Sequence, residues 1–199
     1  MCLVKLIPSD GQKPLKIVIL GEGGVGKTTL SKTFTSKSFF TQAKQTIAVE
    51  FHSKVLYDYS SSQNKLQIWD LGGQEQFKNM GVFKEFCRGS DAALLCFDLT
   101  DLSSLFSIPE WIDFIEPGVP RFLIGTKSDI ASAEERVFDL TSFQEKFRCV
   151  ASFKCSSKDV QSVLGIFETV IDFIHGIKNE KMKSCSRTAL DIPKHLMIS

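Results

Sequence analysis

The sequence lacks the features that would place it among disulfide-rich, membrane-spanning or nucleic-acid-binding proteins. Its six cysteines show no C-x-x-C spacing, which favours a reducing compartment over a disulfide framework. Cys96, Cys149 and Cys155 fall in or beside strand-like segments, where cysteine acts as a small buried apolar residue. No apolar run reaches the roughly 18 residues that a membrane span requires. The formal net charge of +1 gives no electrostatic reason to expect nucleic acid as a partner.

The ends of the chain lack common targeting and lipid-attachment signals. The N-terminus does not have the charge order of a secretory signal, and position 2 is Cys2 instead of the glycine that myristoylation needs. The residues from His195 to Ser199 contain no cysteine and therefore no C-a-a-X motif for prenylation. Three alternatives stay open: function without a lipid, acylation at Cys2 or Cys185, and membership of a longer chain. We therefore expect a cytoplasmic protein and leave open whether it attaches peripherally to the cytosolic face of a membrane.

What is present is the composition of one globular domain. The 199 residues are 43% apolar and 24% charged. We expect an N-terminal leader at 1–14, a domain at 15–175 and a flexible C-terminal tail at 176–199. Strand and helix patterns alternate along the domain after one hairpin. This order predicts an α/β fold, a three-layer sandwich with a mostly parallel six-stranded sheet and one antiparallel hairpin strand.

Apolar runs and periodicity give the expected elements. Strands are predicted at about 15–20, 47–59, 65–70, 92–97, 121–125 and 149–154. Helices are predicted at about 27–37, 82–87, 102–115 (despite Pro109), 141–147 and 160–174. The second strand alternates, so that two sets of side chains point to opposite faces. One set is Ile47, Val49 and Phe51, and the other is Glu50, His52 and Lys54.

The most informative stretch follows the first predicted strand. Residues 21–28 read Gly-Glu-Gly-Gly-Val-Gly-Lys-Thr, which matches G-x-x-x-x-G-K-[ST]. Glycines let backbone N–H groups point at a phosphate, and the following helix adds its positive N-terminal end. Lys27 supplies a charge for the outer phosphates, and the Thr28 hydroxyl can ligate their Mg²⁺. Because a strand precedes this loop and a helix follows it, we interpret it as a phosphate-binding loop.

Three more polar or glycine-rich segments follow predicted strands, at 70–75, 126–129 and 155–158. Ligands of parallel α/β folds bind beyond the carboxyl ends of the strands. Because these segments and the phosphate-binding loop all occupy such positions, the sequence predicts that they line one site.

Together, these motifs resemble those of a known family. Across roughly residues 15–175 it is similar to the Ras superfamily of small GTPases, and to the Rab branch most closely. The guanine-nucleotide motifs of that superfamily occur in order at 21–28, Thr46, 70–74, 126–129 and 156–158. Rab-like segments recur at 47–51, 65–69 and 86–90, whereas 71–74 looks like the Arf branch. The resemblance implies a P-loop GTPase domain that binds GTP or GDP with Mg²⁺ and acts as a molecular switch, in vesicle trafficking or signalling.

The resemblance also implies how the base is recognised. Asp129 would accept two hydrogen bonds from guanine, which adenine cannot offer, and Lys127 would lay its alkyl stem along the base. Phe39 is placed like the aromatic residue that packs on the base in this family, and Phe40 is the alternative.

Two positions in this set depart from the family. Thr126 replaces the commoner Asn, and Ser157 replaces the usual Ala, whose backbone role survives the change. The complete set expected to contact the nucleotide is Gly21, Gly23, Gly24, Val25, Gly26, Lys27, Thr28, Thr29, Phe39, Thr46, Gly73, Thr126, Lys127, Asp129, Ser156, Ser157 and Lys158.

For hydrolysis, the resemblance implies Lys27, Gly73 and Gln74 as the catalytic residues. Gln74 would orient the attacking water, and the Gly73 N–H would contact the γ-phosphate. A side chain at Gly23 would crowd Gln74. No arginine lies in 39–46, so we expect slow turnover without an activating protein that supplies one.

The metal would be Mg²⁺, held directly by Thr28 and Thr46 and through water by Asp70. Thr46 and Gly73 would both touch the γ-phosphate, so hydrolysis would release the two loops that carry them. These loops are where an exchange factor, an activating protein and effectors would bind.

Candidate effector contacts are Ile47, Phe51 and Trp69, with ordinary packing as the alternative role. Two other functions stay open. One is a nucleotide-binding scaffold with negligible hydrolysis (a pseudo-GTPase), which the intact Lys27 and Gln74 disfavour. The other is a P-loop ATPase or metabolic kinase, which Asp129 disfavours.

Overall fold

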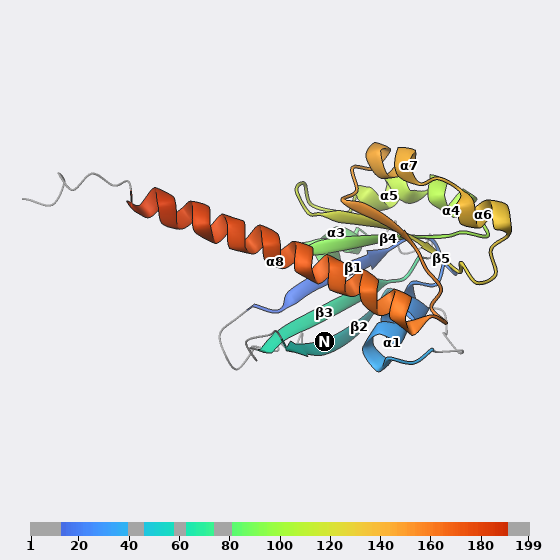
Figure 1. The fold of residues 1–199 in the computed structure, drawn as a ribbon, viewed down its shortest axis with the longest axis horizontal. Helices are drawn as coiled ribbons and strands as arrows, with labels where there is room; N and C mark the ends of the chain where they lie inside the picture. The colour runs from blue at the N-terminus through green and yellow to red at the C-terminus, as the bar shows by residue number, and fades with distance from the viewer. Residues whose placement is uncertain (1–12, 40–45, 58–62, 74–80, 191–199) are drawn as a thin grey trace, which may run out of the picture.

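The structure, a computed structural model, describes residues 13–39, 46–57, 63–73 and 81–190. A six-stranded sheet in the order β2-β3-β1-β4-β5-β6 lies between two layers of helices (Figure 1). β2 and β3 pair antiparallel, and the other neighbouring strands pair parallel. The predicted α/β three-layer sandwich with one antiparallel strand is confirmed.

Each predicted strand has an observed counterpart. The strands are β1 (Leu15–Leu20), β2 (Val49–Tyr57), β3 (Gln63–Leu71), β4 (Ala92–Asp98), β5 (Arg121–Thr126) and β6 (Ala151–Lys154). The helices are α1 (Lys27–Ser36), α3 (Val82–Cys87), α4 (Ser103–Phe106), α5 (Ile108–Ile112), α6 (Ala133–Val137), α7 (Thr141–Lys146) and α8 (Val160–Leu190).

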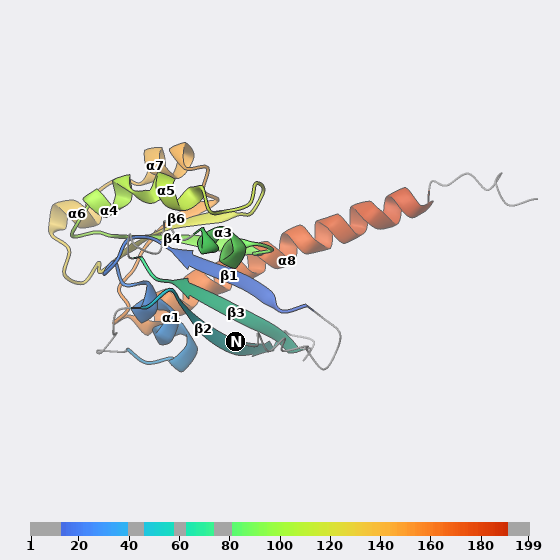
Figure 2. The ribbon, with the colours of Figure 1, turned by 180° about the vertical axis from the view of Figure 1, so that it is seen from behind.

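The central strands are apolar on both sides because helices cover both faces of the sheet (Figure 2). Every residue of β1 and β4 is buried. On one face α1 and α8 pack on the sheet, and Phe34 stacks on Phe167 with ring centroids 3.9 Å apart. On the other face lie α3, α4, α5 and α7, with Phe83 and Trp111 fully buried. These two apolar layers hold the strands in place and fix the sheet edge where the loops meet.

The helix predicted at 102–115 is wrong in its continuity. The structure breaks it into α4 and α5 at Ser107. A proline inside a helix lacks the N–H for the helical hydrogen bond and clashes with the preceding turn. Pro109 avoids both problems because it lies in the first turn of α5. Helix α6 was also not predicted; it begins with a reciprocal capping box between Ser132 and Glu135.

The C-terminal helix is longer than predicted. α8 continues past residue 175 to Leu190 and extends beyond the sheet (Figure 1). The tail predicted from 176 therefore begins as helix, and its flexibility stays a prediction. Contrary to the expectation from the sequence, one stretch of α8, Val160–Lys178, is long and apolar enough to cross a membrane by length and composition, and 33% of it is buried. A helix that covers a sheet meets the same criteria, and Val163, Phe167 and Val170 pack in the core.

Strand β2 exposes apolar side chains and turns charged side chains toward a helix, which is the reverse of the usual arrangement. The side of β2 that carries Phe51 and Val55 is exposed, whereas Glu50 and Lys54 face α1. Ile47, two residues before the strand begins, is exposed as well. The Lys54 ammonium lies 3.9 Å from the centre of the Phe34 ring and donates to the Phe34 carbonyl. An apolar strip on β2 is therefore left on the surface, beside the loop that carries Thr46.

Candidate nucleotide site

The predicted motifs meet at the carboxyl edge of the sheet. Hydrogen bonds join the phosphate-binding loop to Asp70 and to Thr126, and another joins Ser156 to Asp129. Thr46 is also in contact, through Thr28. The structure thus brings all five motifs together. Gln74 and Phe40 lie outside the described residues, so their predicted roles stay predictions.

The phosphate-binding loop is held by close backbone contacts that exclude side chains. A Cβ at Gly21 would lie 2.1 Å from the carbonyl oxygen of Cys96. A Cβ at Gly73 would lie 2.4 Å from the backbone nitrogen of Gly23 and 2.3 Å from the Glu22 carbonyl carbon. At Gly23 itself the nearest atom to a Cβ is the Gly73 carbonyl oxygen, at an ordinary 3.5 Å. The loop after β3 therefore rests directly on the phosphate-binding loop.

We expect Gly73→Ala to destabilise the protein by about 1–3 kcal/mol, because two backbone segments must separate to admit the methyl group. The same change should impair hydrolysis, since it moves the loop that carries the predicted γ-phosphate contact. Gly165→Ala is the matched control, because a Cβ at Gly165 in α8 would meet no atom of its surroundings within 4 Å. It should stabilise the helix by about 0.5–1 kcal/mol. Denaturant unfolding measures both, and equal effects would contradict the contact.

Lys27 is buried at the mouth of this loop. Its Nζ donates to the carbonyl oxygens of Gly21 and Glu22, each at 2.7 Å. The first turn of α1 begins at Lys27, directly after Gly26. A phosphate in the loop would meet both the ammonium and the N-terminal end of this helix.

Thr126 ties the loop to the sheet. Its Oγ1 lies 2.5 Å from the Val25 carbonyl oxygen and 2.9 Å from the Phe97 carbonyl oxygen. A hydroxyl has one proton, so it serves these two acceptors in alternation, whereas an Asn amide would have two donors. The departure from the family's Asn therefore keeps the link between the loop and β4.

Removing this hydroxyl should loosen the loop. We expect Thr126→Val, which keeps the side-chain shape, to lower the free energy of unfolding by about 0.5–1.5 kcal/mol, because it removes the buried hydroxyl that donates to the Val25 and Phe97 carbonyls. Nucleotide should also dissociate faster. Thr169→Val, at an exposed position of α8, should change stability by less than about 0.5 kcal/mol. Thermal unfolding and nucleotide off-rates test this, and equal behaviour of the two variants would contradict it.

The predicted metal ligands converge. Thr28 Oγ1 lies 2.6 Å from Thr46 Oγ1 and donates to Asp70 Oδ2. Asp70 is fully buried, and burial raises the pKa of its carboxyl to about 6. Its Oδ1 has no hydrogen-bond partner within the described part of the chain. Because an orphaned buried carboxylate oxygen is costly, this oxygen-rich group fits Mg²⁺ and its water ligands.

On the base side, Asp129 is held in place by two neighbours. Its Oδ2 lies 2.8 Å from Lys158 Nζ, and its Oδ1 accepts from Ser156 Oγ at 2.7 Å. The Lys158 contact, followed by that of Ser156, holds the pKa of Asp129 below its usual range. The carboxylate is thus ionised and oriented, as an acceptor for two N–H groups must be.

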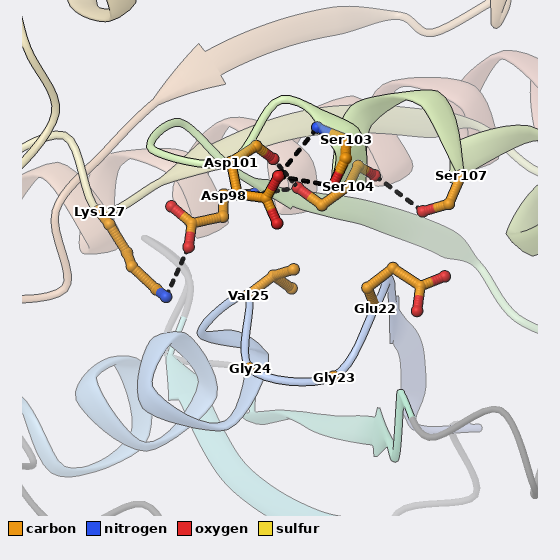
Figure 3. A pocket seen from close by; sticks show the side chains of 10 residues that line it. All are labelled: Glu22, Gly23, Gly24, Val25, Asp98, Asp101, Ser103, Ser104, Ser107 and Lys127. Carbon is orange, nitrogen blue, oxygen red and sulfur yellow. Dashed lines mark hydrogen bonds and ion pairs between the residues drawn. The ribbon is translucent and has the colours of Figure 1, made fainter.

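A cavity of about 510 Å³ lies on the outer side of the phosphate-binding loop (Figure 3). Both members of an ion pair line it, with Lys127 Nζ 2.6 Å from Asp98 Oδ2. Glu22 and Asp101 line it as well. Three carboxylates against one paired ammonium do not suit a phosphate, although the cavity shares Gly23, Gly24 and Val25 with the residues predicted to contact the nucleotide. The Glu22 carboxylate also accepts a hydrogen bond from Trp111 Nε1 at 3.2 Å, which ties the loop to α5.

Sequence reasoning missed Asp98, although a signal was present. Asp98 ends β4 at the same carboxyl edge as the predicted motifs. In the structure it pairs with Lys127 and caps the turn after β4 by accepting from Thr100 N and Oγ1. Lys127 thus lies at the same sheet edge as the other motifs, and its ammonium pairs with Asp98. Its predicted contact with the base stays a prediction.

Comparisons with known proteins agree with the geometry. The family described as "Ras family" matches residues 16–176. "Ras-related protein Rab7A" of Mesembryanthemum crystallinum is 35% identical over 185 residues, which are 86% of this chain and 86% of that protein. "Ras-related protein Rab7" of Pisum sativum is 33% identical over 177 residues, covering 82% of this chain and 84% of that one. "Ras-related protein RABA1c" of Arabidopsis thaliana is 30% identical over 183 residues, covering 89% and 83%. The chain belongs to the Ras family of small GTPases, and these relatives are Rab proteins.

Proposed function

We propose that this protein binds and hydrolyses GTP as a molecular switch, with a Rab-like role in vesicle trafficking or signalling. The main support is the convergence of Thr28, Thr46 and Asp70 beside Lys27, around a buried carboxylate oxygen without a partner among the described residues. This arrangement suits a cation bound between protein oxygens and phosphate oxygens. The ordered Asp129 carboxylate supports guanine as the base.

The proposed mechanism divides binding from switching. Lys27 would neutralise the outer phosphates, and Thr28 and Thr46 would hold Mg²⁺ with Asp70 acting through water. When bound, Mg²⁺ would offset charge that develops on the transferred phosphoryl group. Gln74 would then orient the attacking water, with Gly73 donating its N–H to the γ-phosphate.

The two switch loops are joined by their backbones. Gly72 N donates to the Ala48 carbonyl oxygen at 2.8 Å, and a Cβ at Gly72 would lie 2.7 Å from the Thr46 carbonyl oxygen. A displacement of either loop therefore disturbs the other. This contact supports a switch in which loss of the γ-phosphate releases both loops together.

The surface strip on β2 is the proposed effector surface. Ile47 is 77% exposed and Phe51 53% exposed. Phe51 packs edge-on against Trp69 at 4.3 Å between ring centroids, and Trp69 lies 6.1 Å from Phe86. Exposed aromatic residues beside a switch loop suit a protein partner that reads the state of that loop. We also propose activating and exchange factors as partners at these loops.

We further propose that the protein acts in the cytoplasm. Cys87, Cys96, Cys149 and Cys155 are free thiols, and burial raises the pKa of each. Buried, protonated thiols suit a reducing compartment. Peripheral attachment to a membrane stays an open prediction.

One experiment tests the proposed activity. The nucleotide that remains bound after purification should be GDP or GTP, and single-turnover GTP hydrolysis should be slow but measurable. The Gln74→Leu variant should still bind GTP and lose turnover. Bound ATP would contradict the proposal, and GTP binding without hydrolysis in the wild type would instead favour the scaffold function.

A further inference from the structure

Three potential metal ligands cluster on the α1 side of β2 and β3. One carboxylate oxygen of Glu50, one ring nitrogen of His52 and one carboxylate oxygen of Asp70 lie within 4.8 Å of one another. Glu50 pairs with Asp70 in the antiparallel ladder, and His52 is two residues further along β2. Residues two apart in a strand share a face, so this placement is built into the sheet.

Two atoms of this cluster are orphaned. Asp70 Oδ1 and His52 Nε2 are buried, and neither has a hydrogen-bond partner among residues 13–39, 46–57, 63–73 and 81–190. His52 Nε2 lies 3.9 Å from Glu50 Oε1, which is too long for a hydrogen bond. Leaving a buried polar atom unpaired is unfavourable, because the atom has lost its water without gaining a partner. Two such atoms in one small cluster indicate a ligand that both would contact.

We propose that Glu50, His52 and Asp70 form a binding site for a divalent transition-metal ion such as Zn²⁺. An imidazole with two carboxylates suits Zn²⁺, whereas Mg²⁺ prefers oxygen ligands alone. Zinc bonds of about 2.0–2.2 Å place tetrahedral ligand atoms roughly 3.4 Å apart, so the cluster must contract by side-chain rotation. Three protein ligands leave the fourth position for water. Glu50 and His52 are outside the nucleotide contacts, so this site goes beyond the proposed function.

Lys32 of α1 is the competitor for this site. Its Nζ lies 2.9 Å from Glu50 Oε1, and both side chains are partly exposed. The ammonium provides positive charge beside the cluster, and a metal ion would have to displace it or use the other oxygen of Glu50. The partial exposure of Glu50 gives an ion access from solvent. The affinity should therefore rise when Lys32 is replaced.

Because Asp70 belongs to both metal sites, Zn²⁺ binding should also affect nucleotide binding. This step rests on the proposed function. The same carboxylate would serve Zn²⁺ here and a water ligand of Mg²⁺ in the nucleotide site. Zn²⁺ bound to Glu50 and His52 would therefore weaken Mg²⁺-dependent nucleotide binding. Metal binding itself needs no nucleotide, so it can be measured separately.

The test is a Co²⁺ titration of the full chain after nucleotide and divalent ions are removed. Co²⁺ reports its ligands by visible absorption, and thiolate ligands add strong charge-transfer bands in the near ultraviolet. We expect one Co²⁺ bound without thiolate bands and displaced by Zn²⁺. His52→Ala and Glu50→Gln should each weaken binding at least about tenfold. Lys32→Met should strengthen it, and His175→Ala in α8 is the matched control that should leave it unchanged.

Two results would overturn the site: unchanged affinity in both His52→Ala and Glu50→Gln, or a spectrum dominated by thiolate bands. Circular dichroism checks that each variant is folded. If His52→Ala unfolds, Glu50→Gln decides alone, because it keeps the side-chain shape at a partly exposed position. A failure of GTP binding would leave this titration readable, since no nucleotide is present in it.

Discussion

Asp129→Asn is expected to weaken GDP and GTP binding by about 10²–10⁴-fold and to favour xanthine nucleotides instead. A charge-assisted hydrogen bond contributes about 1.5–3 kcal/mol. The substitution replaces two such bonds by one neutral bond and sets the Asn NH₂ against the exocyclic amine of guanine. Guanine offers two donors to the carboxylate, whereas xanthine carries an oxygen in place of the exocyclic amine. An Asn side chain can accept from one group and donate to the other, so it complements xanthine.

The neighbours of Asp129 can accommodate an Asn side chain without other changes to the site. Ser156 Oγ lies 2.7 Å from Asp129 Oδ1 and can bond equally to an Asn oxygen. Lys158, whose side chain is 58% exposed, loses its 2.8 Å ion pair and can turn to solvent. The substitution should therefore change base preference more than stability. Surface ion pairs of this kind contribute only about 0–1 kcal/mol.

Equilibrium competition between GDP and xanthosine diphosphate measures the preference. Asp172→Asn, an exposed position of α8, is the control and should keep the wild-type preference for guanine. Unchanged GDP affinity in Asp129→Asn would remove this residue from base recognition. Equal loss of both nucleotides would point to a general collapse of the site instead.

The fold was largely predictable because its elements depend on strong local patterns. β1 and β4 are buried on both faces, and a continuous apolar run such as 92–97 admits few other interpretations. The errors occurred where a single residue interrupts an apolar pattern, and where a helix continues after its apolar pattern has ended. Pro109 broke a helix that the apolar spacing predicted as continuous. α8 continued past residue 175, although the apolar pattern that predicted it ends there.

The meeting of the motifs at one sheet edge was predictable, but the pairings between their side chains were not. Motif order placed Lys27, Thr28, Asp70 and Asp129 at one edge of the sheet, and the structure brings them there. The sequence did not indicate that Asp98 pairs with Lys127, because residues far apart in a sequence leave no local pattern of their contact. It also did not indicate which face of β2 is buried, since alternation fixes two faces but not their environments.

Asp70→Asn is expected to separate stability from function. Burial raises the pKa of Asp70 to about 6 from its ordinary value of 3.8. A raised carboxyl pKa means that the folded state holds the proton more tightly than the unfolded state does. Stability contributed by this group therefore falls as pH rises from about 4 through about 6. Two pKa units correspond to about 3 kcal/mol, which the ionised group costs the ligand-free fold at pH 7.

The measurement is the free energy of unfolding of nucleotide-free, Mg²⁺-free protein at pH 4 to 8. The wild-type value minus that of Asp70→Asn should fall by up to about 3 kcal/mol across this range. Comparing the two proteins cancels the other titrating groups. Asp113→Asn, at an exposed position after α5, should show no such trend.

The same variant should lose function as it gains stability. A neutral amide attracts Mg²⁺ and its waters less than a carboxylate does, so Mg²⁺ should slow GDP release in the wild type more than in Asp70→Asn. A gain in stability together with a loss of Mg²⁺ binding would indicate that Asp70 serves binding and lowers the stability of the fold. A flat pH difference would show that Asp70 is not strained in the free protein. Equal Mg²⁺ dependence in both proteins would remove it from the metal site.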